Sequence, residues 1–434
     1  MNDIYDKLIE SVRNDLVPSL GVTEPGAIAF AAASAARAVG GKVSRVTVKL
    51  NSGICKNSFT CAVPGTDGMG CALAAALGSV AGDPSKKLLS TEGADEADIA
   101  EAKRLVSEGS ARAELLDISP EVFIEAVVET DKGSASAVVS GRHDSLTGLS
   151  VNGASLPVGV IGDAEKEAFS VSSVTFADII ECVESAEDLG FVDEAVGMDL
   201  KLFREGRERG LIPLTEARCG TNEEDISSPA DRADLVTSGA IEARVRGANA
   251  PAMAITGSGS HGILCTLPVH EAARSCGERV TAEDERRAIL LSMLITKYIK
   301  ECSGLLSAAC GCVLAGGTGA ALGITYLKAK AAPCADPLEA MLTNALNSMA
   351  ASVTGMICHG GNTGCSLKAS VGVRMAYAAA EMAAKGLGAE SVHGILGLSP
   401  EETMKNMGRI ARDMLSVEKT ILGIMSCKGS YLLI

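Results

Sequence analysis

The feature that most constrains the fold is a long uncharged stretch. Residues 302–327, CSGLLSAACGCVLAGGTGAALGITYL, contain no Asp, Glu, Lys or Arg. A run of this length can cross a lipid bilayer, but its glycines and cysteines make it less apolar than a typical membrane span, and AGGTGA interrupts it. We therefore expect a buried pair of core helices and no membrane partner.

The side chains available for that core are small. Aromatic residues make up only 3% of the 434-residue chain and Trp is absent, so Ala, Val, Leu, Ile, Met and Cys must fill the interior. The length predicts two or three domains, and small side chains suit closely packed helices. A formal net charge of -15 argues against nucleic acid or an anionic membrane as the main partner.

The first residues of the chain indicate whether its cysteines are free thiols or disulfides. The first residues, MNDIYDKLIESVRNDL, lack the basic and apolar regions of a signal peptide. We therefore predict a cytoplasmic protein. Its 14 cysteines are then expected to be mostly free thiols in the core, because disulfides are rare in that compartment.

The N-terminal residues 1–40 have a helical pattern. Pro25 fits the first turn of a helix, and the residues after it, GAIAFAAASAARAV, are strong helix formers. Thr23 and Glu24 are thereby placed at a helix N-terminus, where a preceding polar residue can cap the helix and the helix dipole favours an anion.

The middle region, residues 41–240, mixes strand and helix signals. VSRVTVKL alternates with a period of two, as a half-buried strand does. VFIEAVVET and SASAVVSG flank Asp131-Lys132-Gly133, which predicts a hairpin. Charged helical stretches lie between these strands, so we expect an α+β domain here.

The C-terminal region, residues 241–434, is predicted to be helical. AEDERRAILLSMLITKYIKE has apolar residues at helical spacing, and residues 336–339 and 399–402 both match a capping box with Pro at the first helical position. The expected fold class is α+β. An all-helical C-terminal domain is joined by an N-terminal helix, residues 1–40, and the α+β domain of residues 41–240 is inserted between them.

GSGSHG, residues 257–262, matches the dinucleotide fingerprint G-x-G-x-x-G. The match is weak because no clear βαβ unit surrounds it. Two interpretations remain open. The turn can cradle a carboxylate or phosphate with its N–H groups, or it is only a tight connection between packed segments.

The cysteines near MICHGGNTGC, residues 356–365, raise the question of a metal centre. Cys310-Gly311-Cys312 and Cys358-x6-Cys365 fit no common zinc or ferredoxin spacing. A glycine-rich loop nevertheless lets two thiolates converge on one centre, and Cys302, at a helix end, is a natural third donor. Ordinary core packing of these thiols is the alternative.

Several segments together resemble the L-cysteine desulfidase family and the related iron–sulfur L-serine dehydratases. The resemblance covers essentially the whole chain. It is carried by SLGVTEPGAIAFAAA, KNSFTCAVPGT, PAMAITGSGSHGI, CSGLLSAACGCVLAGGTGA and GMICHGGNTGCSLK.

The resemblance implies a lyase of amino-acid catabolism with a [4Fe-4S] cluster. Carried over residue by residue, the cluster ligands are Cys302, Cys358 and Cys365, and one iron stays open to act as a Lewis acid on the β-substituent. The implied reaction is β-elimination from L-cysteine to sulfide, pyruvate and ammonia. A small amino acid is thus the expected partner, and a homodimer is a candidate assembly.

The resemblance also implies the residues that contact the substrate. Its carboxylate and amine would be held by the SLGVTEP turn, by Lys56-Asn57 and by the GSGSHG loop, and Glu24 is counted with the catalytic residues. The residues expected to bind substrate are Ser19, Thr23, Lys56, Asn57, Ser258, Gly259 and Ser260.

Three departures from the family pattern bear on the chemistry. Val22 stands where the family motif GCTEP has Cys, His359 follows Cys358 where the family has CDG, and TGSGSHG replaces SGSGNQG, which introduces Ser260 and His261. We hypothesise that His261 or His359 performs acid–base work, since His suits proton transfer near neutral pH. A changed substrate or lost activity is the alternative.

Other functions remain open at this point. The same scaffold could act on L-serine or on another small acid, or it could be a non-catalytic iron–sulfur or amino-acid sensor. A nicotinamide-dependent dehydrogenase rests only on GSGSHG. Cys427, near the C-terminus, either reaches the cluster or belongs to a packed tail helix.

Overall fold

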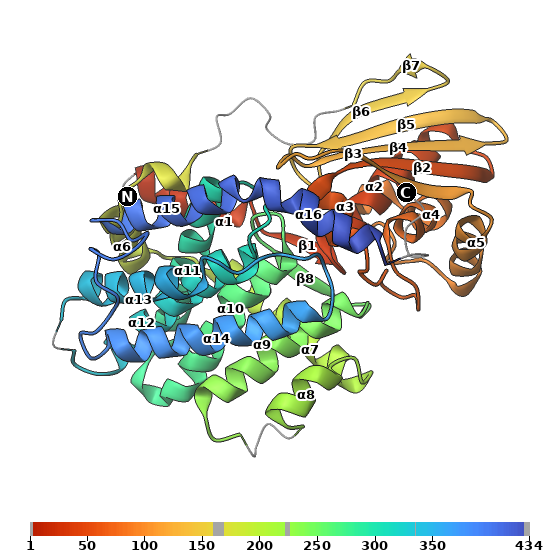
Figure 1. The fold of residues 1–434 in the computed structure, drawn as a ribbon. Coiled ribbons are helices and arrows are strands. Elements are labelled where there is room, and N and C mark those ends of the chain that lie inside the picture. The colour runs from red at the N-terminus through yellow and green to blue at the C-terminus, as the bar shows by residue number, and fades with distance from the viewer. Residues whose placement is uncertain (1–2, 159–168, 222–225, 335, 429–434) are drawn as a thin grey trace.

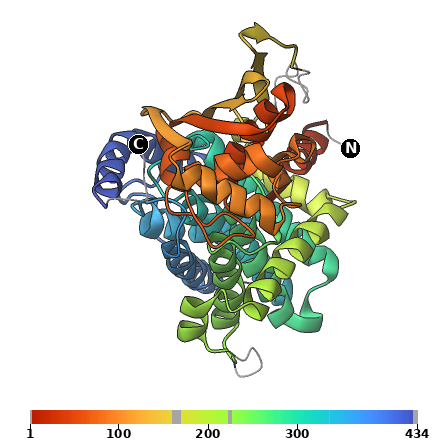
Figure 2. The ribbon, with the colours of Figure 1, turned by 90° about the vertical axis from the view of Figure 1, so that its right-hand side faces the viewer.

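The computed structural model describes residues 3–158, 169–221, 226–334 and 336–428. It has two parts, a sheet covered by helices and a larger helical body, which are stacked on one another (Figures 1 and 2). This arrangement confirms the predicted α+β class with helices dominating the C-terminal half.

The sheet has six strands in the order β3-β2-β4-β5-β6-β7. The strand β2 lies parallel to β3 and antiparallel to β4, and the later strands continue as an antiparallel meander. The alternating residues Val46, Val48 and Leu50 of β2 are buried, as the period of two predicted. The strands are β2 (Val43–Asn51), β3 (Ala111–Asp117), β4 (Phe123–Thr130), β5 (Gly133–Ser140), β6 (Leu146–Val151) and β7 (Ala154–Ser155).

The predicted hairpin lies between β4 and β5. Thr130 pairs with Gly133, so Asp131 and Lys132 form a two-residue turn. Gly133 has φ +136°, a conformation that a residue with a side chain rarely adopts. The hairpin prediction is therefore confirmed at its expected place.

Helices α2 (Thr23–Val39), α4 (Cys71–Ala81) and α5 (Glu96–Ser107) pack on the sheet or on one another. Gly78 of α4 lies against the backbone of Ala29 in α2, where any Cβ would overlap the Ala29 carbonyl. Small side chains thus let these two helices approach closely, as the aromatic-poor composition predicted.

The helical body surrounds the uncharged run. A π-helical segment, η5 (Cys312–Gly317), continues into α12 (Thr318–Ala331), and α12 packs on α10, α11, α13 and α14. The run is long and apolar enough to cross a membrane, but 83% of its most apolar window is buried by neighbouring helices, as in the core of a soluble protein. The helices of the body are α1 (Asp3–Arg13), α6 (Phe176–Ser185), α7 (Gly190–Glu208), α8 (Pro213–Cys219), α9 (Pro229–Val245), α10 (Gly259–Cys276), α11 (Ala282–Ser303), α12, α13 (Leu338–Val353), α14 (Gly364–Ala383), α15 (Pro400–Asp413) and α16 (Leu415–Ser426).

The structure confirms one of the two predicted helix starts and shifts the other. Ser399 caps α15 by accepting a hydrogen bond from the Glu402 N–H, with Pro400 at the first position, as expected. The helix α13 instead begins at Leu338, and Pro337 occupies the cap position without a side-chain bond. Val22 likewise caps α2 without a side-chain bond, because it has no polar atom to offer.

The packing divides the chain differently from the expected ranges. The helix α2 packs on the sheet, not on the C-terminal helices. The helices α6 to α8 and most of α9 lie within residues 41–240 but belong to the core of the helical body. A two-stranded sheet joins the parts, with β1 (Val17–Leu20) antiparallel to β8 (Pro251–Ala254). From the other end of the chain, α16 reaches α3 (Ser52–Ser58) of the sheet part (Figure 1).

Candidate functional site

Two loops of the helical body run side by side and bring cysteines together. Ala309 and Ile357 form an antiparallel bridge, the Cys310 N–H donates to Met356 O (2.8 Å), and the Cys358 N–H donates to Ala308 O (2.7 Å). The loop after α11 is thereby fixed against the loop before α14, and Cys310 and Cys358 lie in neighbouring strands of backbone.

The glycine-rich loop of residues 358–365 rests on α3. The Gly361 N–H donates to Asn57 O (3.1 Å), and a Cβ at 361 would lie 2.7 Å from that oxygen. Gly360 has φ +93° and faces the Lys56 carbonyl with no room for a side chain. The glycines are therefore required for close contact between the loop and the helix that carries Lys56 and Asn57.

Four thiols, Cys310, Cys312, Cys358 and Cys365, influence one another electrostatically, and we call them the thiol cluster. The side chains of Cys312, Cys358 and Cys365 remain partly accessible to solvent. A hydrogen bond from Cys312 lowers the pKa of Cys310, because it stabilises a thiolate there.

Two lysines lie near the thiol cluster, the buried Lys300 and the half-buried Lys368. Burial disfavours the charge of Lys368, but Cys310 and Cys365 outweigh it and raise the pKa of the ammonium group. Burial lowers the pKa of Lys300 to about 8, and Cys312 and Cys358 oppose that shift. The sequence did not indicate a functional role for Lys300, because its helix shows only an ordinary amphipathic pattern.

The structure does not bring Cys302 to this cluster, which corrects the expected ligand set. Positions two apart on a helix differ by about 200° around its axis, so when Lys300 faces the thiols, Cys302 faces the other way. It packs against α15, where a Cβ at Gly408 would overlap the Cys302 Cβ, and Lys405 and Arg412 are its charged neighbours on that helix. Cys310 lies where a third ligand was expected.

The side chains of the thiol cluster are of the kind that iron–sulfur clusters use as ligands, because those ligands are cysteine thiolates. Within the described ranges, no three His, Cys, Asp or Glu side chains are close enough to hold one metal ion. An iron–sulfur cluster needs several thiolates spread around a larger inorganic body. Cys310, Cys358 and Cys365 supply that chemistry, and the nearby lysines balance negative charge.

His261 reaches the same place from α10. Thr256 Oγ1 lies 2.7 Å from Ile255 O and 2.7 Å from His261 Nδ1. When this hydroxyl donates to Ile255 O, it accepts the hydrogen bond of an Nδ1–H group, and the lone pair of the ring is then on Nε2. The Nε2 atom of His261 lies 2.8 Å from the position of a Cβ at Gly311, the residue between Cys310 and Cys312 in the sequence. Burial lowers the pKa of His261 well below its usual value, so the ring is neutral.

The other histidine in the hypothesis has different surroundings. His359 is exposed, and its Nδ1 contacts Asn362 Nδ2 (3.1 Å) in its own loop. Sequence reasoning missed His143, a buried residue whose two ring nitrogens have no partner among the described residues. Its Nδ1 lies 2.9 Å from the Cβ position of Gly257, next to the GSGSHG turn.

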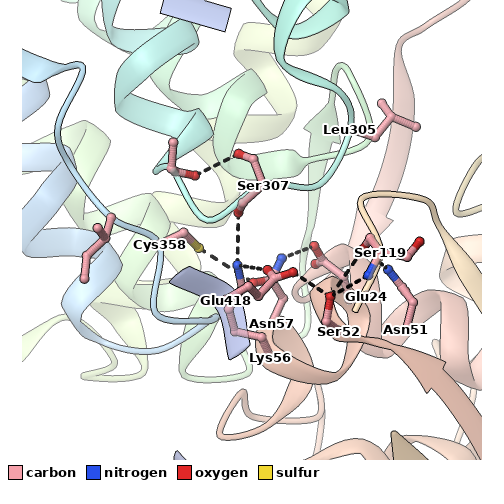
Figure 3. Close-up of polar contacts among 12 residues, drawn as sticks. Glu24, Asn51, Ser52, Lys56, Asn57, Ser119, Leu305, Ser307, Cys358 and Glu418 are labelled. Atoms are coloured by element: carbon pink, nitrogen blue, oxygen red, sulfur yellow. Dashed lines mark hydrogen bonds and ion pairs between the residues drawn. The ribbon is translucent and has the colours of Figure 1, made fainter. Parts of the chain in front are cut away.

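The expected substrate-binding residues form a polar network next to the thiols. Asn57 Nδ2 donates to Glu24 Oε1 (2.6 Å), and Asn57 Oδ1 lies 3.7 Å from Cys358 Sγ (Figure 3). Ser19 Oγ lies 3.5 Å from Thr23 Oγ1. Three segments far apart in sequence therefore meet at one place.

Lys56 is held from two sides. Its Nζ pairs with Glu418 Oε1 of α16 (2.6 Å) and donates to Ser307 O (3.0 Å), and both side chains of the pair are fully buried (Figure 3). Burial opposes the charge on Lys56, but Cys358 and Glu418 outweigh it and raise its pKa.

Arg244, which the sequence did not indicate, connects two of the expected substrate-binding residues, Thr23 and Ser260. Arg244, at the end of α9, donates through Nη1 to Ser260 Oγ (2.9 Å) and through Nη2 to Thr23 Oγ1 (3.0 Å). Ser258 and Gly259 form the start of α10 beside it. No motif pointed to Arg244, because arginines in a helix with a mixed polar and apolar pattern have no recognisable spacing.

The two remaining residues of interest are Val22 and Cys427. Val22 packs with Cys61, Val245 and Cys365, so an apolar contact occupies the place of the family cysteine. Cys427 is exposed at the end of α16.

Two surface cavities lie away from this site. One of about 440 Å³ is lined by residues such as Ala350 and Leu396, and one of about 480 Å³ by residues such as Ser275 and Tyr377. Neither cavity is lined by a residue of the thiol cluster.

Comparison with known proteins gives similarity along the whole chain. A family model described as serine dehydratase alpha chain matches residues 164–423, which include Arg244 and the thiol cluster. A UPF0597 protein of Clostridium botulinum is 36% identical over 432 residues, covering 96% of this chain and 98% of the relative. UPF0597 proteins of Geobacter sulfurreducens and Caldanaerobacter subterraneus are 34% and 32% identical, covering 98% and 96% of this chain and 99% and 97% of their own lengths.

Proposed function

Because the chain belongs to the serine dehydratase alpha chain family, we propose that it is an iron–sulfur-dependent lyase that eliminates the β-substituent of a small amino acid. We place L-cysteine first among its substrates and L-serine second. The observation that carries the proposal is the thiol cluster, in which Cys310, Cys358 and Cys365 supply three ligands next to a network of polar side chains.

The cluster would have a distinct chemical role. A [4Fe-4S] cluster held by three thiolates supplies, when bound, an open iron that is a Lewis acid toward a thiol or hydroxyl group. Lys300 and Lys368 balance the negative charge of the thiolates, and Gly360 and Gly361 hold the ligand loop against α3.

The chain's own residues account for the proton transfer. In the proposed reaction a base removes the α-proton, the electron pair forms the Cα–Cβ double bond, and the C–S bond breaks to release sulfide. The aminoacrylate then takes up water and yields pyruvate and ammonia. We assign the base to His261, whose neutral ring places Nε2 beside Gly311 and can accept a proton through that atom in the tautomer with Nδ1–H. His359, turned toward Asn362, is the second choice.

The test is anaerobic purification followed by assays for iron, sulfide and turnover. We expect a brown protein with about four irons per chain, and release of sulfide from L-cysteine. The variants Cys310→Ser, Cys358→Ser and Cys365→Ser should each lose iron and activity. Pyruvate from L-serine, without sulfide from L-cysteine, would make the enzyme a carbon–oxygen lyase on the same scaffold.

Cys302→Ser is the matched control. It changes a thiol only eight positions from Cys310, but one that faces α15, so it should keep iron and turnover. Iron loss in Cys302→Ser with full iron in Cys310→Ser would contradict the ligand assignment. A brown protein that is inert toward amino acids would contradict the lyase and favour the sensor.

A further inference from the structure

Arg244 is a buried cation with no acidic partner at ion-pair distance among the described residues. Its side chain is only 2% exposed. A guanidinium has five N–H donors, and the structure satisfies two of them, through Ser260 and Thr23, while Nε has no hydrogen-bond partner. An unpartnered buried donor is unfavourable unless a ligand completes its hydrogen bonds.

Two helix N-termini meet at this guanidinium. The helix α2 begins at Thr23 and α10 begins at Gly259, and neither N-cap residue, Val22 or Ser258, makes a side-chain cap bond. Arg244 contacts the first turn of both helices. The N–H groups at both starts therefore add positive potential beside the Arg244 charge.

The nearest carboxylate in the first turn of α2 does not neutralise Arg244 by an ion pair. Glu24, in the first turn of α2, accepts its hydrogen bond from Asn57 and forms no ion pair with Arg244. Gly259 allows the guanidinium to approach the start of α10, because a Cβ there would lie 2.8 Å from Arg244 Nε and 3.0 Å from Cζ. The absence of a side chain at Gly259 thus lets the Arg244 guanidinium lie against the starts of both helices.

We propose that Arg244 binds the α-carboxylate of the substrate and so completes the subsite that the family resemblance places at the SLGVTEP turn and the GSGSHG loop, where α2 and α10 begin. This cation would restrict the protein to acids. The inference rests on the proposed function. It adds which chemical group of the substrate this part of the site recognises, the α-carboxylate. A guanidinium can bind a carboxylate through two parallel N–H···O bonds, which Lys cannot reproduce.

The test is calorimetric binding of L-alanine to the anaerobically purified protein. L-alanine carries the α-carboxylate and amine but no leaving group, so it binds without reacting. We expect Arg244→Lys to weaken L-alanine binding by roughly tenfold or more, the loss of a charge-assisted hydrogen bond. Ethylamine, which lacks the carboxylate, should not bind.

Arg246→Lys is the matched control. Arg246 lies two residues further along the chain and pairs with Glu242, outside the subsite, so the variant should bind L-alanine as the wild type does. If Arg244→Lys shows no cooperative thermal transition, Gly259→Ala decides instead. The added Cβ would displace the guanidinium, and binding should weaken by a similar factor.

Three results would overturn the subsite. They are absence of L-alanine binding by the wild type, equal binding by a folded Arg244→Lys variant, and inorganic phosphate that binds as tightly as L-alanine, since that would indicate a general anion site. Turnover of L-cysteine is measured in parallel. Arg244-dependent binding without turnover of any amino acid contradicts only the lyase, whereas turnover with an unchanged KM in Arg244→Lys contradicts only the subsite.

Discussion

Asp199 is a carboxyl group buried inside the helical body, on α7. Its Oδ1 accepts a hydrogen bond from the Met253 N–H (3.0 Å), and its Oδ2 lies 3.1 Å from Thr266 Oγ1. The single hydroxyl proton of Thr266 also reaches Gly262 O (2.8 Å), so a protonated Asp199 can donate to Thr266 in turn. Burial raises the pKa of Asp199 to about 7, because the charged form is poorly solvated there.

This shift predicts a pH dependence of stability. A raised folded-state pKa means that the carboxyl group lowers the free energy of unfolding as pH rises from about 4, where the unfolded carboxyl ionises, to about 7. Asp199→Asn keeps both hydrogen bonds and never ionises. Relative to wild type it should be more stable by about 1.4 kcal/mol at pH 5 and by about 4 kcal/mol at pH 8 in chemical denaturation. Asp193→Asn, an exposed position on the same helix, should change by less than about 1 kcal/mol, and a gain independent of pH in Asp199→Asn would refute the assignment.

At the scale of elements, α16 is attached to the sheet part by a buried ion pair. Glu418 pairs with Lys56 through Oε1 and accepts a hydrogen bond from Ser52 Oγ (2.5 Å) through Oε2. Ile421 and Met425 of the same helix pack with Phe59 just after α3. Helix α16 thus fixes the position of α3, which carries Lys56 and Asn57.

Removing one partner of that pair should be costly. Glu418→Gln leaves the Lys56 charge buried without its counter-ion, and we expect a loss of about 3–5 kcal/mol in the free energy of unfolding, together with faster proteolysis of α16. Lys419→Gln, exposed on the same helix, should change stability by less than about 0.5 kcal/mol. The double variant Lys56→Met/Glu418→Leu should recover much of the loss, and a double variant no more stable than Glu418→Gln would show that the charge is not the cause.

At the scale of the whole molecule, the candidate site belongs to neither part alone. Thr23 and Asn57 come from the sheet part, whereas Arg244 and the thiol cluster come from the helical body. Strands β1 and β8 and helix α16 connect the two. A ligand in the site therefore bridges both parts.

This bridging predicts how a ligand stabilises the molecule. L-alanine at a hundred times its Kd should raise the free energy of unfolding by about 2.7 kcal/mol, provided that it binds only the folded state. We expect the melting temperatures of both parts to rise together in differential scanning calorimetry. Ethylamine at the same concentration is the control. A scan in which only one of two transitions moves with L-alanine would contradict a site shared between the parts.

Local pattern was sufficient for much of the fold and part of the site. The alternation in β2, the turn at Asp131 and Lys132, and the start of α15 at Pro400 all depend on neighbours in sequence. The glycines of MICHGGNTGC correctly indicated a loop that other backbone approaches closely. The small side chains of the uncharged run likewise indicated a buried helix.

The sequence by itself determined the strand β2, the β4–β5 hairpin and the helical character of the C-terminal region, that the core is built of small residues, and that Cys358 and Cys365 share a loop, because each depends on short-range spacing and composition. It did not indicate the strands β1, β6 and β8. Only the tertiary structure decided that α2 covers the sheet, that Cys310 and not Cys302 faces the other thiols, and that Arg244 and Lys300 join them. The physical reason is orientation. Which side chains meet depends on how each helix is turned toward its neighbours. Local sequence patterns do not show which helices pack together, so they do not show which side chains meet.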